Sequence, residues 1–364
     1  MHSKKINITF IIPSLIPGGA ERILSFVAKN IDREKFNPTL LVIGFAKNTV
    51  YELDDLNVIY LNKTRVIKSV FPLISYFRKE KPQIVLSSIF HLNTLIAFLS
   101  LFFPKIKFVA REANVLSALA KHGQNSNLNG LKLLIVTAYK LIDCLICQSK
   151  DMQQDMVNNF GVTIDKTVLI NNPITSNNKP KETNRDITKP LKIITVGRLS
   201  KEKGHKRIIE VLAKLTFPFQ YYLIGDGLEK EELLALIQQK GITNFVTHIP
   251  YTKDVDGFLR QSDVFLQGSY SEGFPNALIE SCVVGTPIIA FNAPGGINEI
   301  IEPGENGFII NSIEECVEKL TQLNTDFVFS PKRVNQIVTE RFNSEKIIGQ
   351  YEDLFLKLTN NYDN

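Results

Sequence analysis

Apolar runs and amphipathic stretches alternate along the chain, which predicts strands separated by helices. Amphipathic spacing, with apolar residues every three or four positions, favours helices at 20–30, 131–141, 149–160, 205–215 and 255–261. Short apolar runs bounded by turn residues predict strands at 5–12, 39–45, 58–61, 84–88, 108–110, 144–147 and 168–170, and again at 191–196, 221–224, 245–249, 263–266 and 286–290. Strands that alternate with helices form parallel sheets, so the predicted fold class is α/β.

A polar segment interrupts this alternation and divides the chain into two parts. Residues 173–189 are rich in asparagine and lysine and contain proline, which predicts a linker between domains. A chain of 364 residues is long enough for two domains. The predicted domains are residues 1–172 and 190–343, and a last amphipathic helix is expected from about residue 344.

Residues 271–280 carry the clearest candidate chemistry, because they predict a turn and a helix start between two strands. Gly273 allows a tight turn and Pro275 suits the first position of a helix. The free N–H groups of that helix start favour an anionic ligand. We expect Glu272 and Glu280 to flank one cleft outside the core, where carboxylates accept hydrogen bonds from sugar hydroxyls. The spacing alone equally allows two solvated glutamates beside a glycine turn.

Glycine turns follow two other predicted strands. Residues 197–204 follow the first strand of the second domain and present Arg198 and Lys203. A guanidinium group binds phosphate oxygens in pairs and an ammonium group acts as a point charge, so the two could clamp a diphosphate. Gly18 and Gly19 separate the first strand of the chain from its helix, which would let the backbone approach a phosphate. Glycine turns are common after strands, so this second pattern is weak by itself.

Polar residues also follow two strands of the first domain. His91 is expected in the loop after the strand 84–88, and Arg111 and Glu112 end the strand 108–110. Open α/β sheets bind ligands at the carboxyl ends of their strands, which makes His91 a candidate site residue, with a purely structural role as the alternative. Residues 117–130 are polar and predict a mobile loop over the same edge.

The charge of the chain is distributed unevenly. Residues 1–172 carry a net charge of +9 and the remainder −4, which together give the +5 of the whole chain. A basic first half implies an anionic partner. Residues 62–80 interleave basic with apolar and aromatic residues, which suits a helix lying on an anionic membrane; the alternative is a surface helix that packs its apolar side on the sheet. No apolar run approaches the ~20 residues of a membrane span.

Other motifs favour structural explanations. Cys144 and Cys147 form a C-x-x-C inside an apolar run, and four cysteines in the chain are no disulfide framework, so we expect buried thiols and a reducing compartment. Asp254 and Asp256 fit D-x-D by letters but stand at a predicted helix start, so we expect capping and no metal site. The apolar run after Lys4 and Lys5 is short and lacks a cleavage site, which favours a first strand over a signal peptide.

Several motifs, taken in order, resemble those of the retaining glycosyltransferases of family 4. They are Gly18-Gly19-Ala20-Glu21-Arg22, Gly197-Arg198-Leu199 with Lys203-Gly204, Gly225-Asp226-Gly227, Glu272 with Glu280, and Gly285-Thr286-Pro287-Ile288-Ile289-Ala290. The resemblance implies the GT-B fold, with two Rossmann-like domains facing across a deep cleft. It also implies that the last helix crosses back, so that the acceptor-binding domain is 1–172 plus 344–364 and the nucleotide-sugar-binding domain is 190–343.

The resemblance assigns roles to the candidate residues. Arg198 and Lys203 would hold the donor diphosphate, and Glu280 the ribose hydroxyls. Glu272 would hold the donor sugar and phosphate. The residues that would assist it through their backbone are Gly273, Phe274, Pro275 and Asn276. In the first domain, Gly18 and Gly19 would close onto the diphosphate, and His91 falls where such enzymes often place a residue near the donor sugar.

The expected reaction is transfer of a hexose or N-acetylhexosamine from a nucleotide-sugar, UDP-linked by expectation, to a hydroxyl of a lipid-linked glycan in surface polysaccharide biosynthesis. Cleaving the sugar–phosphate bond leaves charge on the diphosphate, which fixed cations stabilise without a metal or cofactor. The protein is expected in the cytoplasm, peripheral on the inner face of the membrane, with no nucleic-acid partner. The alternatives are a sugar-nucleotide epimerase of the same fold and a non-catalytic bilobal binding protein.

Overall fold

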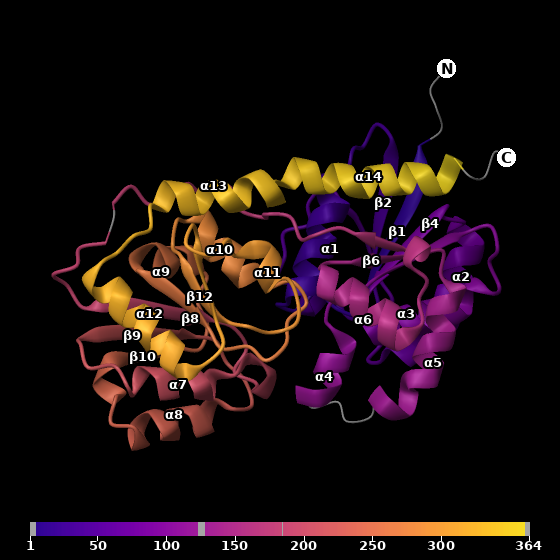
Figure 1. Cartoon of the computed structure of the whole chain (residues 1–364). Coiled ribbons are helices and arrows are strands. Elements are labelled where there is room, and N and C mark those ends of the chain that lie inside the picture. Colours follow the sequence, from indigo (N-terminus) through magenta and orange to yellow (C-terminus); the bar gives the residue numbers. More distant parts are fainter. Residues whose placement is uncertain (1–4, 123–127, 184, 361–364) are drawn as a thin grey trace. The chain divides into compact units, whose positions relative to one another are not determined.

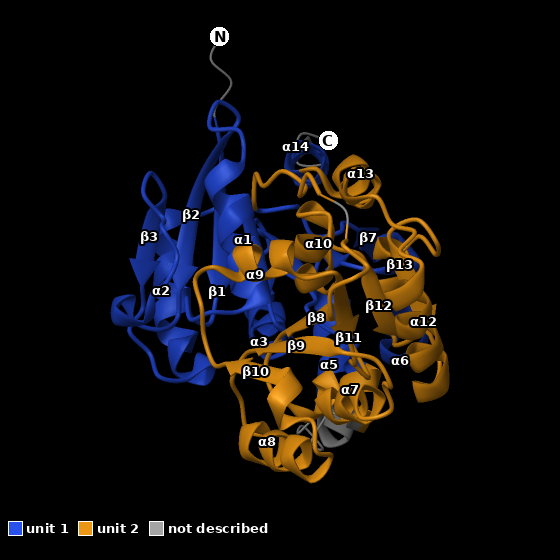
Figure 2. Cartoon of the chain, turned by 90° about the vertical axis from the view of Figure 1, so that its left-hand side faces the viewer, with its two compact units in different colours: residues 1–116, 127–175, 344–364 blue, residues 117–126, 176–343 orange. Residues whose placement is uncertain are grey.

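The computed structural model describes residues 5–122, 128–183 and 185–360 of the chain. The chain divides into two compact units, shown in different colours in Figure 2. Unit 1 contains residues 1–116, 127–175 and 344–364, and unit 2 contains residues 117–126 and 176–343. Each unit has its own sheet and its own core.

The described residues of unit 1 form a seven-stranded sheet in which every pair of neighbours is parallel (Figure 1). The strand order is β3-β2-β1-β4-β5-β6-β7. The strands are β1 (Ile6–Ile12), β2 (Phe36–Val42), β3 (Asn57–Tyr60), β4 (Ile84–Ser88), β5 (Lys107–Arg111), β6 (Cys144–Cys147) and β7 (Thr167–Leu169). They follow the predicted apolar runs, because strands covered on both faces by helices need apolar side chains at nearly every position.

Helices cover both faces of this sheet, and alternate residues of one strand show the two layers. In β1, Phe10 packs in a cluster with α1, and Ile11 packs in a second cluster with α2 and α3. Successive side chains of a strand point to opposite faces, which accounts for the two clusters. The helices of unit 1 that precede α14 are α1 (Gly19–Asn30), α2 (Val70–Glu80), α3 (Phe90–Ser100), α5 (Leu128–Leu141) and α6 (Lys150–Phe160), while α4 (Leu116–His122) falls almost wholly in unit 2.

The C-terminal helix α14 (Ser344–Asn360) packs in the core of unit 1 and belongs to that unit. Tyr351 and Phe355 are both fully buried and lie one helical turn apart on one face. The Phe355 ring meets Phe10 of β1 and Phe36 of β2 edge-on, with 6.1 Å between centroids in each case. Aromatic side chains buried in this way contribute about 1.5–3 kcal/mol each, which holds the helix on the sheet.

A buried arginine connects the two segments through which the chain leaves unit 1 and returns to it. Arg111 ends β5 and has no exposed surface. Its Nη2 donates to Oδ1 of Asn172 at 2.5 Å, and its Nε donates to the Tyr351 hydroxyl of α14 at 3.1 Å. Its Nη1 donates to Oγ of Ser88 at 3.4 Å. Arg111 therefore has a structural role in the fold of unit 1.

Glu112, the next residue, is a buried carboxyl group that makes stability depend on pH. Burial raises its pKa from the ordinary 4.5 to about 8, although Asn93 donates to its Oε1 at 2.9 Å. The folded state then holds a proton that the unfolded chain releases above about pH 4.5, so this group destabilises the fold progressively between pH 4.5 and 8.

We expect Glu112→Gln, which cannot ionise, to remove that part of the pH dependence. The free energy of unfolding of the variant minus that of the wild type should increase as pH rises from 5 to 8. The increase should be up to about 1.4 kcal/mol per pH unit for one proton. Urea denaturation at each pH measures it. A difference between the two proteins that stays constant with pH would contradict the assignment.

The described residues of unit 2 form a six-stranded parallel sheet in the order β10-β9-β8-β11-β12-β13. The strands are β8 (Leu191–Val196), β9 (Phe219–Ile224), β10 (Val246–Ile249), β11 (Val264–Gln267), β12 (Ile288–Phe291) and β13 (Gly307–Ile310). The helices are α7 (His205–Leu212), α8 (Lys230–Gln239), α9 (Val255–Gln261), α10 (Asn276–Val283), α11 (Ile297–Ile300), α12 (Ile313–Thr325) and α13 (Pro331–Phe342). The fold class is therefore α/β in both units.

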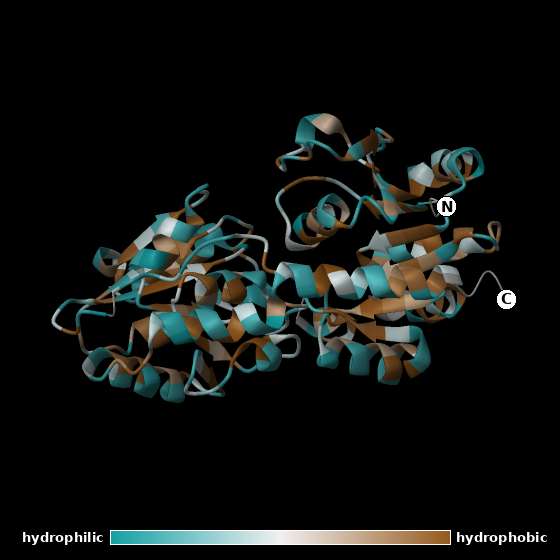
Figure 3. Cartoon of the chain, turned by 90° about the horizontal axis from the view of Figure 1, so that it is seen from above, coloured by the Kyte–Doolittle hydropathy of each residue, from teal (hydrophilic) through white to brown (hydrophobic). Residues whose placement is uncertain are grey.

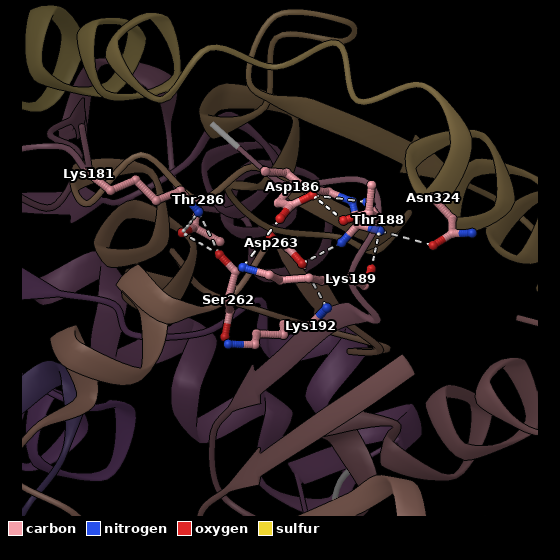
Figure 4. Close-up of polar contacts among 10 residues, drawn as sticks. Lys181, Asp186, Thr188, Lys189, Lys192, Ser262, Asp263, Thr286 and Asn324 are labelled. Carbon is pink, nitrogen blue, oxygen red and sulfur yellow. Dashed lines mark hydrogen bonds and ion pairs between the residues drawn. The ribbon is translucent and has the colours of Figure 1, made fainter. Parts of the chain in front are cut away.

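The predicted linker is irregular but is bonded to unit 2 (Figure 4). Nζ of Lys181 donates to the carbonyl oxygen of Ser262 at 2.6 Å and to Oγ1 of Thr286 at 3.1 Å. Arg185, whose side chain is 1% exposed, forms an ion pair with Oδ2 of Asp263 at 2.7 Å. Burial lowers the pKa of Lys181 to about 8. The segment after residue 175 is thus bound by side-chain contacts to the rest of unit 2.

One predicted loop was wrong in part. Residues 117–130 were expected to be a mobile loop, but α4 runs to His122 and α5 begins at Leu128, while residues 123–127 lie outside the described residues. The helix α4 forms because Leu116 and Ala118 are buried and the residues around them are good helix formers. The polar residues later in this stretch led to the prediction of a loop, although its first residues include these buried apolar ones.

Apolar side chains lie mainly inside the units. In Figure 3 the strands beside the marked chain ends are mostly brown, and teal residues alternate with brown along the helices. This is the amphipathic pattern of helices that cover a sheet. In the described parts of the chain, no helix combines the length and the apolar character needed to cross a bilayer.

Candidate functional site

The strand order creates a reversal point in each sheet. In unit 2, β8 lies between β9 and β11, so the connections after β8 and after β11 lead to opposite sides. Ligands of open α/β sheets bind in the crevice outside the carboxyl ends of such strands. The segments that follow these two strands are residues 197–204 and 268–275, which contain most of the predicted site residues.

Lys203 and Glu272, one from each segment, form an ion pair beyond the carboxyl ends of β8 and β11. Nζ of Lys203 lies 2.7 Å from Oε1 and 2.8 Å from Oε2 of Glu272. The lysine side chain keeps 29% of its surface exposed, while the glutamate keeps 7%. The ammonium group therefore bonds to a buried carboxylate, while the lysine side chain keeps some contact with solvent.

Glu272 is more buried than expected, which corrects the prediction that it lies outside the core. Only 6% of the residue is exposed. Besides Lys203, its Oε1 accepts hydrogen bonds from Oγ of Ser269 at 2.5 Å and from Nε2 of Gln267 at 3.4 Å. A buried carboxylate requires such partners, because an unpaired buried charge is costly.

Two glycines allow the segments to approach closely enough for this pair. Gly204 adopts a φ of +59°, and a Cβ added there would lie 1.9 Å from the carbonyl oxygen of Gly268. A Cβ added at Gly268 would lie 2.6 Å from the carbonyl oxygen of Gly204. Any side chain at either position would force the segments apart and pull Lys203 away from Glu272.

The residues after Glu272 are anchored by a second turn. The Glu272 amide donates to the carbonyl oxygen of Pro294 at 2.9 Å, and the Gly296 amide donates to that of Gly273 at 3.0 Å. Phe274 is 5% exposed and packs edge-on against Phe342 of α13, with 5.3 Å between ring centroids. Phe274 therefore fixes the loop in the core, and only its backbone could contribute to binding.

The helix α10 begins one residue later than predicted. Pro275 occupies the N-cap position with extended backbone, and Asn276 is the first helical residue. Glu280 lies on this helix and is half-buried. The start of α10 thus follows directly on the Glu272 loop at the carboxyl end of β11, as the sequence predicted.

Arg198 follows β8 and has an exposed side chain. Its carbonyl oxygen accepts a hydrogen bond from Nε2 of His205, the first residue of α7, at 2.9 Å. His205 is 2% exposed, and burial lowers its pKa, so its ring is neutral. This bond links the start of α7 to the segment that carries Arg198 and Lys203, in which Arg198 is exposed and Lys203 is half-buried.

In unit 1 the reversal lies between β1 and β4, and the remaining predicted residues follow these strands. Gly18 precedes α1, and both its amide and its carbonyl oxygen bond to the Tyr51 hydroxyl at 2.9 Å. That amide already has a partner, so the exposed Gly19 at the helix start is the more open position for a ligand.

His91 lies in helix α3, not in a loop, which corrects its predicted location. The helix starts at Phe90 because Ile89 turns the chain sharply, with a φ of 80° and a ψ of 127°. A β-branched residue at positive φ is strained, and such strain is concentrated at functional sites. His91 is exposed on the first turn of the helix, next to this strained residue.

Two motifs have the structural roles that were predicted for them. Cys144 and Cys147 are buried in β6, and burial raises the pKa of the Cys144 thiol to about 12, so it stays protonated. Asp254 caps α9 by accepting a hydrogen bond from the Gly257 amide at 3.0 Å. Among the residues that the structure describes, no group of three or more His, Cys, Asp or Glu side chains is placed to hold a metal ion.

A family model matches the part of the chain that contains Arg198, Lys203, Glu272 and Glu280. Residues 177–338, nearly all of unit 2, match the family model described as glycosyl transferases group 1. The match lies within unit 2 and identifies the protein as a glycosyltransferase. The resemblance stated from the sequence motifs is therefore confirmed.

Relatives of known sequence are similar over most of the chain. An uncharacterized glycosyltransferase of Haemophilus influenzae is 27% identical over 370 residues, covering 96% of this chain and 99% of its own. A Campylobacter jejuni protein, N-acetylgalactosamine-N,N'-diacetylbacillosaminyl-diphospho-undecaprenol 4-alpha-N-acetylgalactosaminyltransferase, is 27% identical and covers 82% of this chain and 84% of its own.

Solved structures of glycosyltransferases share the fold, which is GT-B. The apo form of the lipopolysaccharide outer core galactosyltransferase WaaB has a TM-score of 0.78 at 19% identity, covering 97% of this chain and 99% of its own. Anabaena HepE in complex with UDP-glucose has a TM-score of 0.81 at 21% identity and covers 97% of this chain and 100% of its own.

The sequence predictions missed the residues that support the site. Ser269 and Gln267 bond to Glu272, His205 holds the carbonyl oxygen of Arg198, and Arg207 contacts the segment before Glu272. None belongs to a motif that the sequence analysis singled out. Arg207 and Glu272 are far apart in the sequence, so no local pattern predicts that they lie near each other.

Proposed function

We propose that the protein transfers a hexose or N-acetylhexosamine from a UDP-sugar to a hydroxyl of a lipid-linked glycan in surface polysaccharide biosynthesis. The observation that carries the proposal is the Lys203–Glu272 pair beside the start of α10, with the exposed Arg198 on the neighbouring segment. These groups combine cations for a diphosphate with a carboxylate for hydroxyl groups. That combination fits a nucleotide-sugar.

The chemistry follows from where the charge develops. The bond between the sugar C1 and the phosphate oxygen breaks, and the bond between C1 and the acceptor oxygen forms. Arg198 and Lys203 stabilise the charge on the departing diphosphate, which is the largest electrostatic demand of the reaction. The acceptor's proton passes to the departing phosphate oxygen on the same face of the sugar, so the configuration at C1 is retained.

The nature of donor and acceptor is supported by the similar proteins. The Campylobacter relative is named for transfer to a diphospho-undecaprenol-linked sugar, and HepE was solved with UDP-glucose. Other relatives are named for O-antigen and lipopolysaccharide core biosynthesis. A lipid-diphosphate acceptor is anionic, which suits the net charge of +9 in residues 1–172.

We further propose that the enzyme needs no metal ion or cofactor, because Arg198 and Lys203 supply the charge that a cation would bring. Gly18, Gly19 and His91 are proposed to contribute from unit 1, on the donor diphosphate and near the transferred sugar respectively. Their position after β1 and β4, at the reversal point of the sheet, supports a ligand-binding role.

Association with the inner face of the cytoplasmic membrane is proposed through the segment 62–80 of unit 1. Its buried side confirms the packing alternative for Leu73 and Phe77, which join the core. Its other side exposes 67% of Ile67 and 82% of Phe71, beside exposed basic residues. Apolar side chains among basic ones are typical of a surface that lies on anionic lipid.

We expect the double substitution Ile67→Ser and Phe71→Ser to weaken binding to anionic vesicles about tenfold, because the apolar contribution to insertion is lost. Sedimentation with vesicles rich in phosphatidylglycerol measures it. Val328→Ser, at a residue of unit 2 that is 51% exposed, is the matched control and should bind as the wild type does. Equal binding by all three proteins would contradict a membrane role for this segment.

Glu280→Ala should mainly weaken nucleotide binding. Loss of a hydrogen bond to a charged group costs about 1.5–3 kcal/mol, so the Kd of UDP should rise about 10- to 100-fold while turnover at saturating donor changes less. Calorimetric titration with UDP and saturation kinetics separate the two effects. Glu231→Ala, at an exposed residue of α8, is the control. An unchanged Kd for UDP would remove Glu280 from the ribose site.

Thermal denaturation with a panel of nucleotide-sugars tests the proposed donor. A ligand that binds only the folded protein raises Tm, by an amount that grows with its concentration above Kd. UDP-sugars should raise Tm and GDP- and ADP-sugars should not, and Arg198→Ala should reduce the shift. A Tm raised only by another nucleotide would overturn the assignment of UDP.

A further inference from the structure

We propose that Arg207 is a positioning residue that holds the Glu272 carboxylate, and through it the Lys203 ammonium group, in the geometry needed for turnover. This inference rests on the proposed function for its kinetic test. Arg207 acts through the backbone of Gly268 and Ser269, on which the position of Glu272 depends.

The guanidinium group of Arg207 lies between two aromatic rings. Its Cζ is 4.2 Å from the ring centroid of Tyr270 and 4.1 Å from that of Phe291 in β12. Such stacking on both faces restricts the planar group to one orientation. Burial lowers its pKa to about 10, so it remains charged at neutral pH.

From this orientation, Arg207 donates hydrogen bonds to two consecutive carbonyl groups. Its Nε donates to the carbonyl oxygen of Gly268 at 2.5 Å, and its Nη2 donates to that of Ser269. The strand β11 ends at Gln267, so these carbonyl groups lie just beyond its ladder. Arg207 thus continues the fixed backbone past the end of the strand.

The fixed backbone carries a direct partner of Glu272. Ser269, whose carbonyl oxygen accepts from Arg207, donates its own hydroxyl to Oε1 of Glu272 at 2.5 Å. The same oxygen lies 2.7 Å from Nζ of Lys203. The sequence of contacts from guanidinium to backbone to hydroxyl to carboxylate to ammonium is continuous. A shift of the Gly268–Ser269 backbone would therefore move the cation that is proposed to bind the diphosphate.

A second contact holds the two segments together at the same place. The amide of Tyr270 donates to the carbonyl oxygen of Glu202 at 2.8 Å. The residue whose ring stacks on Arg207 is therefore hydrogen-bonded to the segment that carries Lys203. The Arg207 side chain also lies next to the close contact between Gly204 and Gly268. A Cβ built at Gly204 would lie 3.2 Å from its Nε. Displacing Arg207 would loosen the two segments jointly.

A double-mutant cycle in the full-length protein tests the proposal. Arg207→Met should lower kcat with a UDP-sugar about 10- to 100-fold, the effect of a misplacement of about 1 Å, with little change in KM for the donor. Arg207→Lys, which keeps the charge but cannot donate to both carbonyl groups, should be intermediate. In the Glu272→Gln background, Arg207→Met should lower kcat less than about threefold, because the two residues act through one contact.

Lys206→Met is the matched control. Lys206 is the neighbour of Arg207 on α7, but its side chain is 42% exposed and its ammonium group pairs with Glu232 of α8. Its kcat should equal that of the wild type. If Arg207→Met does not fold, Tyr270→Leu replaces it, since Tyr270 is 38% exposed and its loss removes one stacking face without opening the core. Tyr270→Leu should then lower kcat and show the same loss of effect in the Glu272→Gln background.

Amide hydrogen exchange gives a readout that needs no turnover. Exchange of residues 268–274 should accelerate in Arg207→Met and remain unchanged in Lys206→Met. Equal falls in kcat in both backgrounds, or unaltered exchange of this segment, would overturn the role of Arg207. A wild-type protein that turns over no UDP-sugar, with exchange accelerated as expected, would instead refute the proposed function and leave the positioning role standing.

Discussion

Replacing Lys203 by alanine should lower kcat with a UDP-sugar about 100- to 1000-fold. The substitution removes a fixed positive charge at the point where the diphosphate becomes more negative, and loss of one such group typically has an effect of that size. It also leaves the Glu272 carboxylate buried without its ammonium partner, which repels the donor phosphates. Initial rates of UDP release at saturating donor measure the effect.

Glu272→Ala should lower kcat comparably, because the carboxylate holds the Lys203 ammonium group and is proposed to bind the donor sugar. The double variant Lys203→Ala, Glu272→Ala should be hardly worse than either single variant, since residues that act as one unit are non-additive. Lys201→Ala, two residues away and exposed, is the control and should retain activity. Multiplicative losses in the double variant would contradict the paired arrangement.

Phe355→Ala should destabilise unit 1 by about 3–5 kcal/mol. The ring is fully buried and packs against Phe10, Phe36 and Tyr351, so its removal leaves a cavity at the contact of α14 with the sheet. Urea denaturation followed by circular dichroism measures the change in the free energy of unfolding.

The same helix provides the control for this stability prediction. Asp353→Ala, at an exposed position of α14, should change stability by no more than about 0.5 kcal/mol. If Phe355→Ala unfolds like Asp353→Ala, α14 contributes nothing to the stability of unit 1. That outcome would contradict the core described for this helix.

Periodicity predicted the sheets well because their strands are buried on both faces. The runs 191–196 and 263–266 correspond to β8 and β11 within one or two residues, and the position of Glu272 after β11 followed from them. Such runs are apolar at nearly every position and need no knowledge of the tertiary structure. The carboxyl-end location of the candidate site was therefore available from the sequence.

Side-chain burial and long-range contacts were less predictable. Glu272 was expected near solvent, but Gln267, Ser269 and Lys203 satisfy it in a buried position. Arg207 was one basic residue among many on an amphipathic helix, and its two aromatic neighbours come from β12 and the β11 loop. No local pattern encodes contacts between residues 60 or more positions apart in the sequence.

Helix starts were the other source of error. His91 was predicted in a loop, but α3 begins at Phe90, one residue before it. Only Ile89 lies between β4 and α3, and it makes the turn by adopting a positive φ instead of capping the helix with its side chain. A β-branched residue is the last type that propensity would choose for such a turn. Strain of this kind is imposed by the tertiary structure, so sequence reasoning could not anticipate it.

Release of UDP from UDP-sugars in the presence of a lipid-diphosphate-linked acceptor tests the central claim most directly. The wild-type protein should release UDP from at least one UDP-sugar, only when acceptor is present, and Arg198→Ala should abolish most of that release. Turnover of the donor without acceptor would favour an epimerase. Absence of Arg198-dependent UDP release with every UDP-sugar and acceptor tried would contradict the claim that this site transfers sugar from a UDP donor.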